Sequence, residues 1–191
     1  MADEYPVLTF ASDATWEAWL RENHDRALGV WLRIAKAGKA ERTVTHLEAL
    51  DVALCYGWID GQRKPLDGTH FLQKFTHRRP RSMWSRINTE KVARLIEAGR
   101  MTDAGLAEVE AAKRDGRWDA AYASWGSATM PDDLTRALDA TPAARKKFDE
   151  LDSRNRYAIV YRVETAKRPQ TRRARIEKYV AMLAEGRTIY P

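Results

Sequence analysis

The spacing of the apolar residues changes once along the chain, and this change constrains the fold more than any other feature. In the segment 29–35, apolar residues alternate with their neighbours, so that Val30 and Leu32 face one way and Trp31 the other, which is strand periodicity. From Ser82 onward, apolar residues recur every three or four positions, as in helices. Strands followed by a helical tail favour an α+β fold over a doubly wound parallel sheet. We expect a small, mostly antiparallel sheet in the N-terminal half and a helical C-terminal half.

Local signals place the other elements of the first half. A short strand is expected over Tyr5–Phe10, and Ser12 is a helix cap. Thr45 and Glu48 have the spacing of a capping box, which predicts a helix that ends at Gly57. That helix is expected to turn three leucines toward the core, namely Leu47, Leu50 and Leu54. A hairpin with strands over 59–64 and 71–76 is expected to follow it.

The second half reads as a series of capped helices. Asn88 and Thr102 are expected to cap two of them, and Pro131 and Pro142 to open two more. Two longer helices are expected over 153–166 and 169–185. The connector 118–129 is the best candidate for a boundary. We therefore expect a mixed α+β domain over residues 1–122 and a helical region over residues 129–191 that packs on it as one compact unit, with a core that includes Leu32, Ile34, Leu50, Leu54, Val160 and Val180.

Positive charge is concentrated in two stretches of a chain whose net charge is +6. Residues 62–86 hold seven Lys or Arg residues against one Asp, and residues 167–178 hold six against one Glu. Such patches favour an anionic ligand, nucleic acid or a partner surface. Two solvated faces are the alternative, because Lys and Arg are ordinarily exposed.

Several classes of protein are excluded or disfavoured by what the sequence lacks. No segment approaches the ~20 apolar residues of a membrane span, and the N-terminus has no apolar signal region, so we expect a cytoplasmic protein. The single Cys55 cannot form an internal disulfide and is expected to be a buried thiol. The four histidines lack metal-ligand spacing, and phosphate-loop, dinucleotide and serine-elbow motifs do not occur, so we expect neither a metal nor a cofactor.

The candidate site combines aromatic rings with a dense set of cations. Rings beside cations offer stacking and charge together, as an anionic aromatic ligand or a nucleic acid base requires. One carboxylate, Asp60, either organises the guanidinium groups or forms a turn with Gly61. Trp58 and Trp84 alternatively lie in the core under arginine stems. The predicted ligand-binding residues are Trp58, Asp60, Arg63, Lys64, Phe75, Arg78, Arg79 and Arg81.

Three blocks of the chain carry a resemblance to a known family. The segments are 29–36 with 48–50, then 55–64 with 75–85, and finally 151–157 with 165–172. In these blocks the chain resembles the bacterial YdeI/OmpD-associated family, also labelled bacteriocin-protection proteins. The resemblance implies a bacterial origin and a role in tolerance of antimicrobial compounds, and it implies no catalytic residues.

Taken together, these features lead us to expect a binding or protection protein rather than an enzyme. Its partner would be an anionic or aromatic small molecule. One alternative is a nucleic-acid-binding protein that uses the two basic stretches. Another is an enzyme that acts on an anionic substrate with Asp60 or His77 as proton carrier. The sequence leaves the oligomeric state open.

Overall fold

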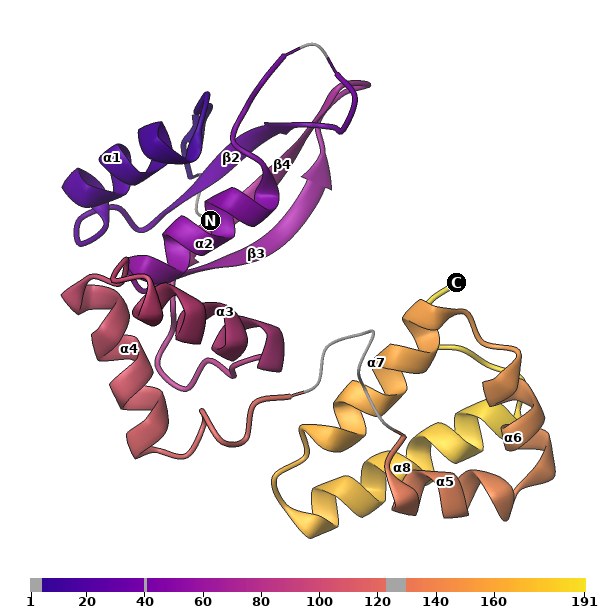
Figure 1. Ribbon diagram of the computed structural model, residues 1–191. Coiled ribbons are helices and arrows are strands. Elements are labelled where there is room, and N and C mark those ends of the chain that lie inside the picture. Colours follow the sequence, from indigo (N-terminus) through magenta and orange to yellow (C-terminus); the bar gives the residue numbers. More distant parts are fainter. Residues whose placement is uncertain (1–4, 40, 123–129) are drawn as a thin grey trace. The chain divides into compact units, whose positions relative to one another are not determined.

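The computed structural model describes residues 5–39, 41–122 and 130–191, and it confirms the α+β class (Figure 1). The chain divides into two compact units. Unit 1 comprises Met1–Trp84 with Asn88–Ala120, and unit 2 comprises Ser85–Ile87 with Ala121–Pro191. Most of the predicted connector, residues 123–129, lies outside the described residues. The packing of the helical region on the mixed domain stays a prediction.

Unit 1 is built on a four-stranded sheet with the strand order β1-β2-β4-β3. β1 is parallel to β2, and the two other pairings are antiparallel, so the mostly antiparallel sheet is confirmed. The first strand is shorter than predicted. It pairs in parallel because helix α1 carries the chain back across the sheet before β2 begins, as a parallel pair requires. The strands are β1 (Val7–Leu8), β2 (Gly29–Ala35), β3 (Trp58–Pro65) and β4 (His70–His77).

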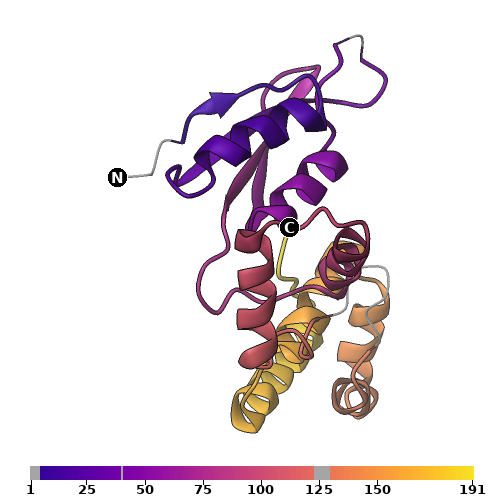
Figure 2. The same cartoon turned by 60° about the vertical axis from the view of Figure 1, so that its left-hand side comes forward.

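Helices α1 (Asp13–Asn23) and α2 (His46–Cys55) contact each other, and aromatic side chains join them to one face of this sheet, here called the helix face (Figures 1 and 2). The Trp16 ring lies 5.8 Å from that of Phe75, between ring centres, and its indole nitrogen donates to the Ala49 carbonyl. The opposite face, here called the open face, carries residues that alternate with those of the core. The open-face residues include Trp31, Arg33, Ile59, Gly61, Lys64, Lys74 and Thr76.

Local capping chemistry explains where the helices begin. The Ser12 cap and the Thr45–Glu48 capping box are both present, and Thr102 caps α4 (Asp103–Arg114). Gly57 ends α2 with a φ of 73°, a conformation that favours glycine. A Cβ at this position would also lie 3.0 Å from the Ala104 carbonyl oxygen, so only glycine allows α4 to approach.

The orientation of α2 differs from the prediction at one residue. Leu50 and Leu54 are buried as expected, but Leu47 is 63% exposed, so its predicted place in the core is wrong. The buried arc of α2 is centred on the small residues Ala49 and Ala53, which let the helix approach the sheet closely. Leu47 lies on the far side of that arc.

The reactivity of Cys55 tests whether this thiol is buried in the core of unit 1. Burial raises the pKa of its thiol to about 11, so the thiol stays protonated when the protein is folded. We expect it to react with a disulfide reagent about 100-fold more slowly in folded than in unfolded protein at pH 8. Because the unfolded thiol ionises near pH ~8.5, this group should lower the stability as the pH rises above that value. Equal labelling rates in native buffer and in denaturant would contradict the placement.

Unit 2 is helical and has its own core. Its helices are α5 (Asp132–Asp139), α6 (Pro142–Asp149), α7 (Ser153–Glu164) and α8 (Pro169–Ala184). Val160 is buried as predicted, whereas Val180 is only partly buried. Pro131 precedes α5 as its cap rather than opening it. The largest fully buried side chains of this core are Leu134, Leu138, Phe148 and Ile159.

Helix α3 (Arg86–Glu97), most of which belongs to unit 1, begins two residues before the predicted Asn88 cap. Its Lys91 forms an ion pair with Asp51 of α2. Among the described residues, no helix is both long and apolar enough to cross a bilayer.

Candidate functional site

Two of the predicted ligand residues lie in the core of unit 1. Trp58 and Phe75 have no exposed surface. The indole nitrogen of Trp58 donates a 3.0 Å hydrogen bond to the His24 carbonyl, and its ring packs edge-on against Trp16. Neither ring face is therefore open to a ligand in this structure.

Arg78 also has a structural place. It is 5% exposed, and its guanidinium lies 3.6 Å above the ring centre of Trp84 while one of its amino groups donates to the Met83 carbonyl. Trp84 is 1% exposed, as expected for a core tryptophan under an arginine stem. Arg78 thus covers the Trp84 ring on this side of the core.

Asp60 pairs with a histidine that the sequence analysis did not single out. Its carboxylate lies 2.9 Å from Nε2 of His46, at the start of α2, and both side chains are about a quarter exposed. Asp60 belongs to β3 and not to a tight turn, because the register shift between Asp60 and Arg63 is a β-bulge. Under the enzymatic alternative, His46 is therefore a candidate proton carrier besides the predicted His77. His77 lies at the exposed end of β4.

The structure does not bring the arginines to one concavity. Arg63 lies on the helix face, where it lines a pocket with Lys36 and Phe71. Arg79 lines a cleft on the open face. Arg81 is exposed in the turn after β4, with a φ of 66°, and does not line that cleft.

The open-face cleft has a volume of about 370 Å³. Its floor is formed by strand residues of β3 and β4, and its positive charge comes from Lys74 and Arg79. A Cβ at Gly61 would lie 3.8 Å from the Cβ of Lys74, an ordinary contact, so only a longer side chain at this position would fill the cleft. The cleft is lined by Ile59, Gly61, Gln62, Lys74, Thr76, His77, Arg79 and Ser82.

Aromatic rings hold the lysines beside this cleft. The Lys64 ammonium lies 4.3 Å from the ring centre of Trp31, and the Lys74 ammonium lies 4.4 Å from that of Tyr5 and 6.0 Å from that of Trp31. The prediction had Lys64 but missed Trp31, Lys74 and Tyr5. The alternation of β2, which turns Trp31 away from the core residue Leu32, is the signal that could have found this ring.

Among the described residues, the cations of this cleft have no acidic partner. In the part of the chain that the structure describes, no carboxylate lies within ion-pair distance of Lys64, Lys74 or Arg79. By contrast, Arg33 forms a bidentate pair with Glu41, at 2.7 and 3.0 Å. We call Trp31, Lys64, Lys74, Arg79 and the cleft between β3 and β4 the cationic open-face site.

Two arginines of the second basic stretch are engaged inside unit 2. Arg172 makes two hydrogen bonds of 2.6 and 2.8 Å to the Asp133 carboxylate, which hold the pKa of Asp133 below its ordinary value. Arg175 donates to the Arg162 carbonyl. These two arginines join α8 to α5 and α7, so they are engaged in structure.

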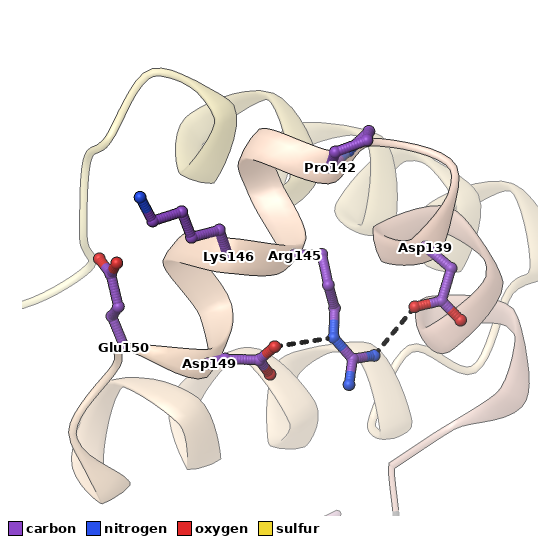
Figure 3. A pocket seen from close by; sticks show the side chains of 6 residues that line it. All are labelled: Asp139, Pro142, Arg145, Lys146, Asp149 and Glu150. Carbon is purple, nitrogen blue, oxygen red and sulfur yellow. Dashed lines mark hydrogen bonds and ion pairs between the residues drawn. The ribbon is translucent and has the colours of Figure 1, made fainter.

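A hollow on unit 2 offers a second concave surface, of about 590 Å³ (Figure 3). Figure 3 shows Arg145 between Asp139 and Asp149, to which it donates at 3.0 and 3.1 Å. Lys146 faces Glu150 at the other side of the hollow. Because its arginine is already paired with two carboxylates, this hollow is a weaker anion site than the open face.

In comparisons with known proteins, the N-terminal and C-terminal parts of the chain match two different family models. Residues 8–108, more than half of the chain, match the model of a domain of unknown function, DUF8412. The chain belongs to this family. Residues 127–186 match the model described as bacteriocin-protection, YdeI or OmpD-associated, which confirms the resemblance for the C-terminal part. The blocks at 29–36 and 55–85 fall within the DUF8412 match instead. A search of curated proteins and a search of solved structures each found no match.

Proposed function

We propose that this protein binds an anionic small molecule with a planar ring at the cationic open-face site and does not transform it. The single observation that supports the proposal most strongly is the set of three cations, Lys64, Lys74 and Arg79, that have no carboxylate partner among the described residues. Like charges on one face repel one another, and a bound anion relieves that repulsion.

The neighbouring rings support a ligand that carries a ring of its own. Trp31 and Tyr5 hold the lysine ammonium groups over their faces, which orders these otherwise flexible side chains. A ring in the ligand would extend this stack, while its anionic group would enter the cleft beside Arg79. A cleft of about 370 Å³ is within the range of small-molecule sites.

The first test uses a matched pair of probes, adenosine monophosphate and uncharged adenosine, in calorimetric titrations. We expect binding of the monophosphate that adenosine does not show. Lys74→Ala and Arg79→Ala should each weaken it about tenfold, the loss of roughly 1.4 kcal/mol expected for one charged hydrogen bond. Arg21→Ala, which removes an exposed charge from α1 on the other side of the sheet, is the control. The proposal would be contradicted if Arg21→Ala weakened monophosphate binding as much, or if adenosine bound as tightly as the monophosphate.

The size of the cleft gives a second, independent prediction. Gly61→Leu should block the cleft, because the new side chain begins beside Lys74 and fills the space that glycine leaves. We expect monophosphate binding to fall at least about tenfold while the unfolding midpoint changes little, as is typical of surface substitutions. Gly61→Ala adds only an ordinary contact and should retain most of the affinity. If Gly61→Leu binds normally, the ligand does not occupy the cleft.

A single-stranded nucleic acid is the competing ligand, because lysines and a ring on an exposed sheet face also suit a run of stacked bases. Titration with a thymidine 20-mer at several salt concentrations separates the two. Affinity that rises strongly with strand length and falls steeply with salt would favour the strand. Affinity no better than that of the monophosphate would favour the small molecule.

Protection against antimicrobial compounds is the biological role that we attach to this binding. The support for it is the printed description of the family matched by residues 127–186, which names bacteriocin protection. Sequestration of a compound requires binding without catalysis, in keeping with the proposed site.

A further inference from the structure

A second pocket of unit 1 lies on the opposite side of the sheet from the cationic open-face site. It has a volume of about 520 Å³ and is lined by Lys36, Ala37, Arg63, Pro65 and Phe71. Arg63 is paired in register with Gln73 on the helix face, whereas Lys64 and Lys74 belong to the open face. The two sites are therefore separated by the sheet itself.

The orientation of Arg63 is built in by the bulge of β3. The bulge between Asp60 and Arg63 interrupts the ladder, and the buried amide of Gln73 donates to the Gly61 and Gln62 carbonyls, at 3.0 and 3.3 Å. Gln73 is 2% exposed, so these bonds fix its amide. Its remaining oxygen accepts a 3.1 Å hydrogen bond from Nε of Arg63.

A ring completes the support of this guanidinium. The Arg63 guanidinium carbon lies 4.2 Å from the centre of the Phe71 ring, a stacking that suits a planar cation. Within the described ranges, its two terminal nitrogens have no protein hydrogen-bond or ion-pair partner. Arg63 is thus held from below and from its Nε side, while its two-nitrogen edge is left for a ligand.

The rest of the pocket adds charge and apolar surface. Lys36 donates to the Asp67 carbonyl at 2.8 Å, which holds its ammonium near the pocket. Oδ1 of the Asp67 carboxylate accepts two hydrogen bonds from Thr69 and one from the His70 amide, which tie this oxygen to the turn. The pocket therefore combines two cations with a wall formed by Phe71, Pro65 and Ala37.

From these contacts we propose that the Lys36–Arg63–Phe71 pocket binds a carboxylate that carries an apolar ring or chain. The two carboxylate oxygens match the two terminal nitrogens of Arg63, the pairing in which arginine is strongest. The apolar body lies against Phe71 and Pro65. Preorganisation of the arginine by Gln73 reduces the ordering cost of binding. This site is independent of the proposed open-face function.

The test compares 2-naphthoate with 2-naphthamide, which has the same rings and no charge, by calorimetric titration of the full chain. We expect naphthoate to bind and Arg63→Ala to weaken it at least about tenfold. Arg63→Lys, which keeps the charge but not the paired nitrogens, should also weaken it severalfold. Arg21→Ala is again the control. Equal affinity for the amide, or unchanged affinity in Arg63→Ala, would overturn the proposal.

A spectroscopic readout separates a positioned arginine from a merely nearby charge. In NMR spectra the Arg63 Nε–H signal should exchange slowly with water, because Gln73 accepts its proton, and it should shift when naphthoate is added. Gln73→Met should abolish the slow exchange and weaken naphthoate binding although Arg63 is present. Fast exchange of the Arg63 signal in the unaltered protein would refute the preorganisation even if Gln73→Met failed to fold. Because the open-face proposal is measured with adenosine monophosphate and Lys74→Ala, either proposal can fail without the other.

Discussion

Replacing Trp58 by alanine should lower the free energy of unfolding of unit 1 by about 3–5 kcal/mol, the range for large-to-small changes of a buried aromatic residue. The substitution removes a fully buried ring that contacts Trp16 and Trp19 and leaves the His24 carbonyl without its donor. Urea denaturation followed by circular dichroism measures the change. Two transitions are to be fitted where the two units unfold separately.

Trp31→Ala is the matched comparison, because it removes the same side chain from the open face of the same sheet. Its ring is only partly buried, and we expect a cost of about 1 kcal/mol or less. Binding of adenosine monophosphate should show the reverse order, lost in Trp31→Ala and retained in folded Trp58→Ala. If Trp58→Ala were as stable as the unaltered protein, its ring would be available to a ligand after all.

Asn155→Ala should release the C-terminal residues of unit 2 and cost about 1–3 kcal/mol, the penalty for buried polar groups that lose their partners. The side chain of Asn155 is buried, and its oxygen accepts from the amides of Ile189 and Tyr190 at 3.1 and 2.9 Å. Its amide group donates to the Tyr190 carbonyl. The ring of Tyr190 also lies against Arg154, whose guanidinium carbon is 4.1 Å from the ring centre.

Hydrogen exchange of the Ile189 and Tyr190 amides measures this release directly. Asn155→Asp is the graded control, because the carboxylate keeps the acceptor for both amides and loses only the donor to Tyr190. We expect fast exchange in Asn155→Ala and intermediate exchange in Asn155→Asp. Unchanged protection of both amides in Asn155→Ala would show that other contacts hold the tail.

Local patterns predicted the elements of this chain well, because the interactions that define them are close in sequence. The capping box of α2 needs only Thr45 and Glu48, three residues apart. The alternation of β2 likewise placed Leu32 in the core. The partners of Asn155 lie about 35 residues away, and no local pattern encodes such a contact.

The candidate site was predicted less well for a physical reason that lies in β3. Unbroken alternation would put Trp58, Asp60 and Lys64 on one face of the strand. The bulge after Asp60 shifts the phase by one residue, so that Arg63 joins the helix face and Lys64 the open face. A single inserted residue therefore exchanges the faces on which Arg63 and Lys64 lie.

The same bulge bears on whether the edge of this sheet can pair with another chain. β3 is an outer strand of the sheet, and an outer strand offers a template on which another chain adds a strand and starts an aggregate. The bulge turns the Gly61 and Gln62 carbonyls to the Gln73 amide, and Pro65 at the strand end has no N–H to offer. The irregularity that orients Arg63 thus also makes this edge a poor surface for intermolecular strand growth.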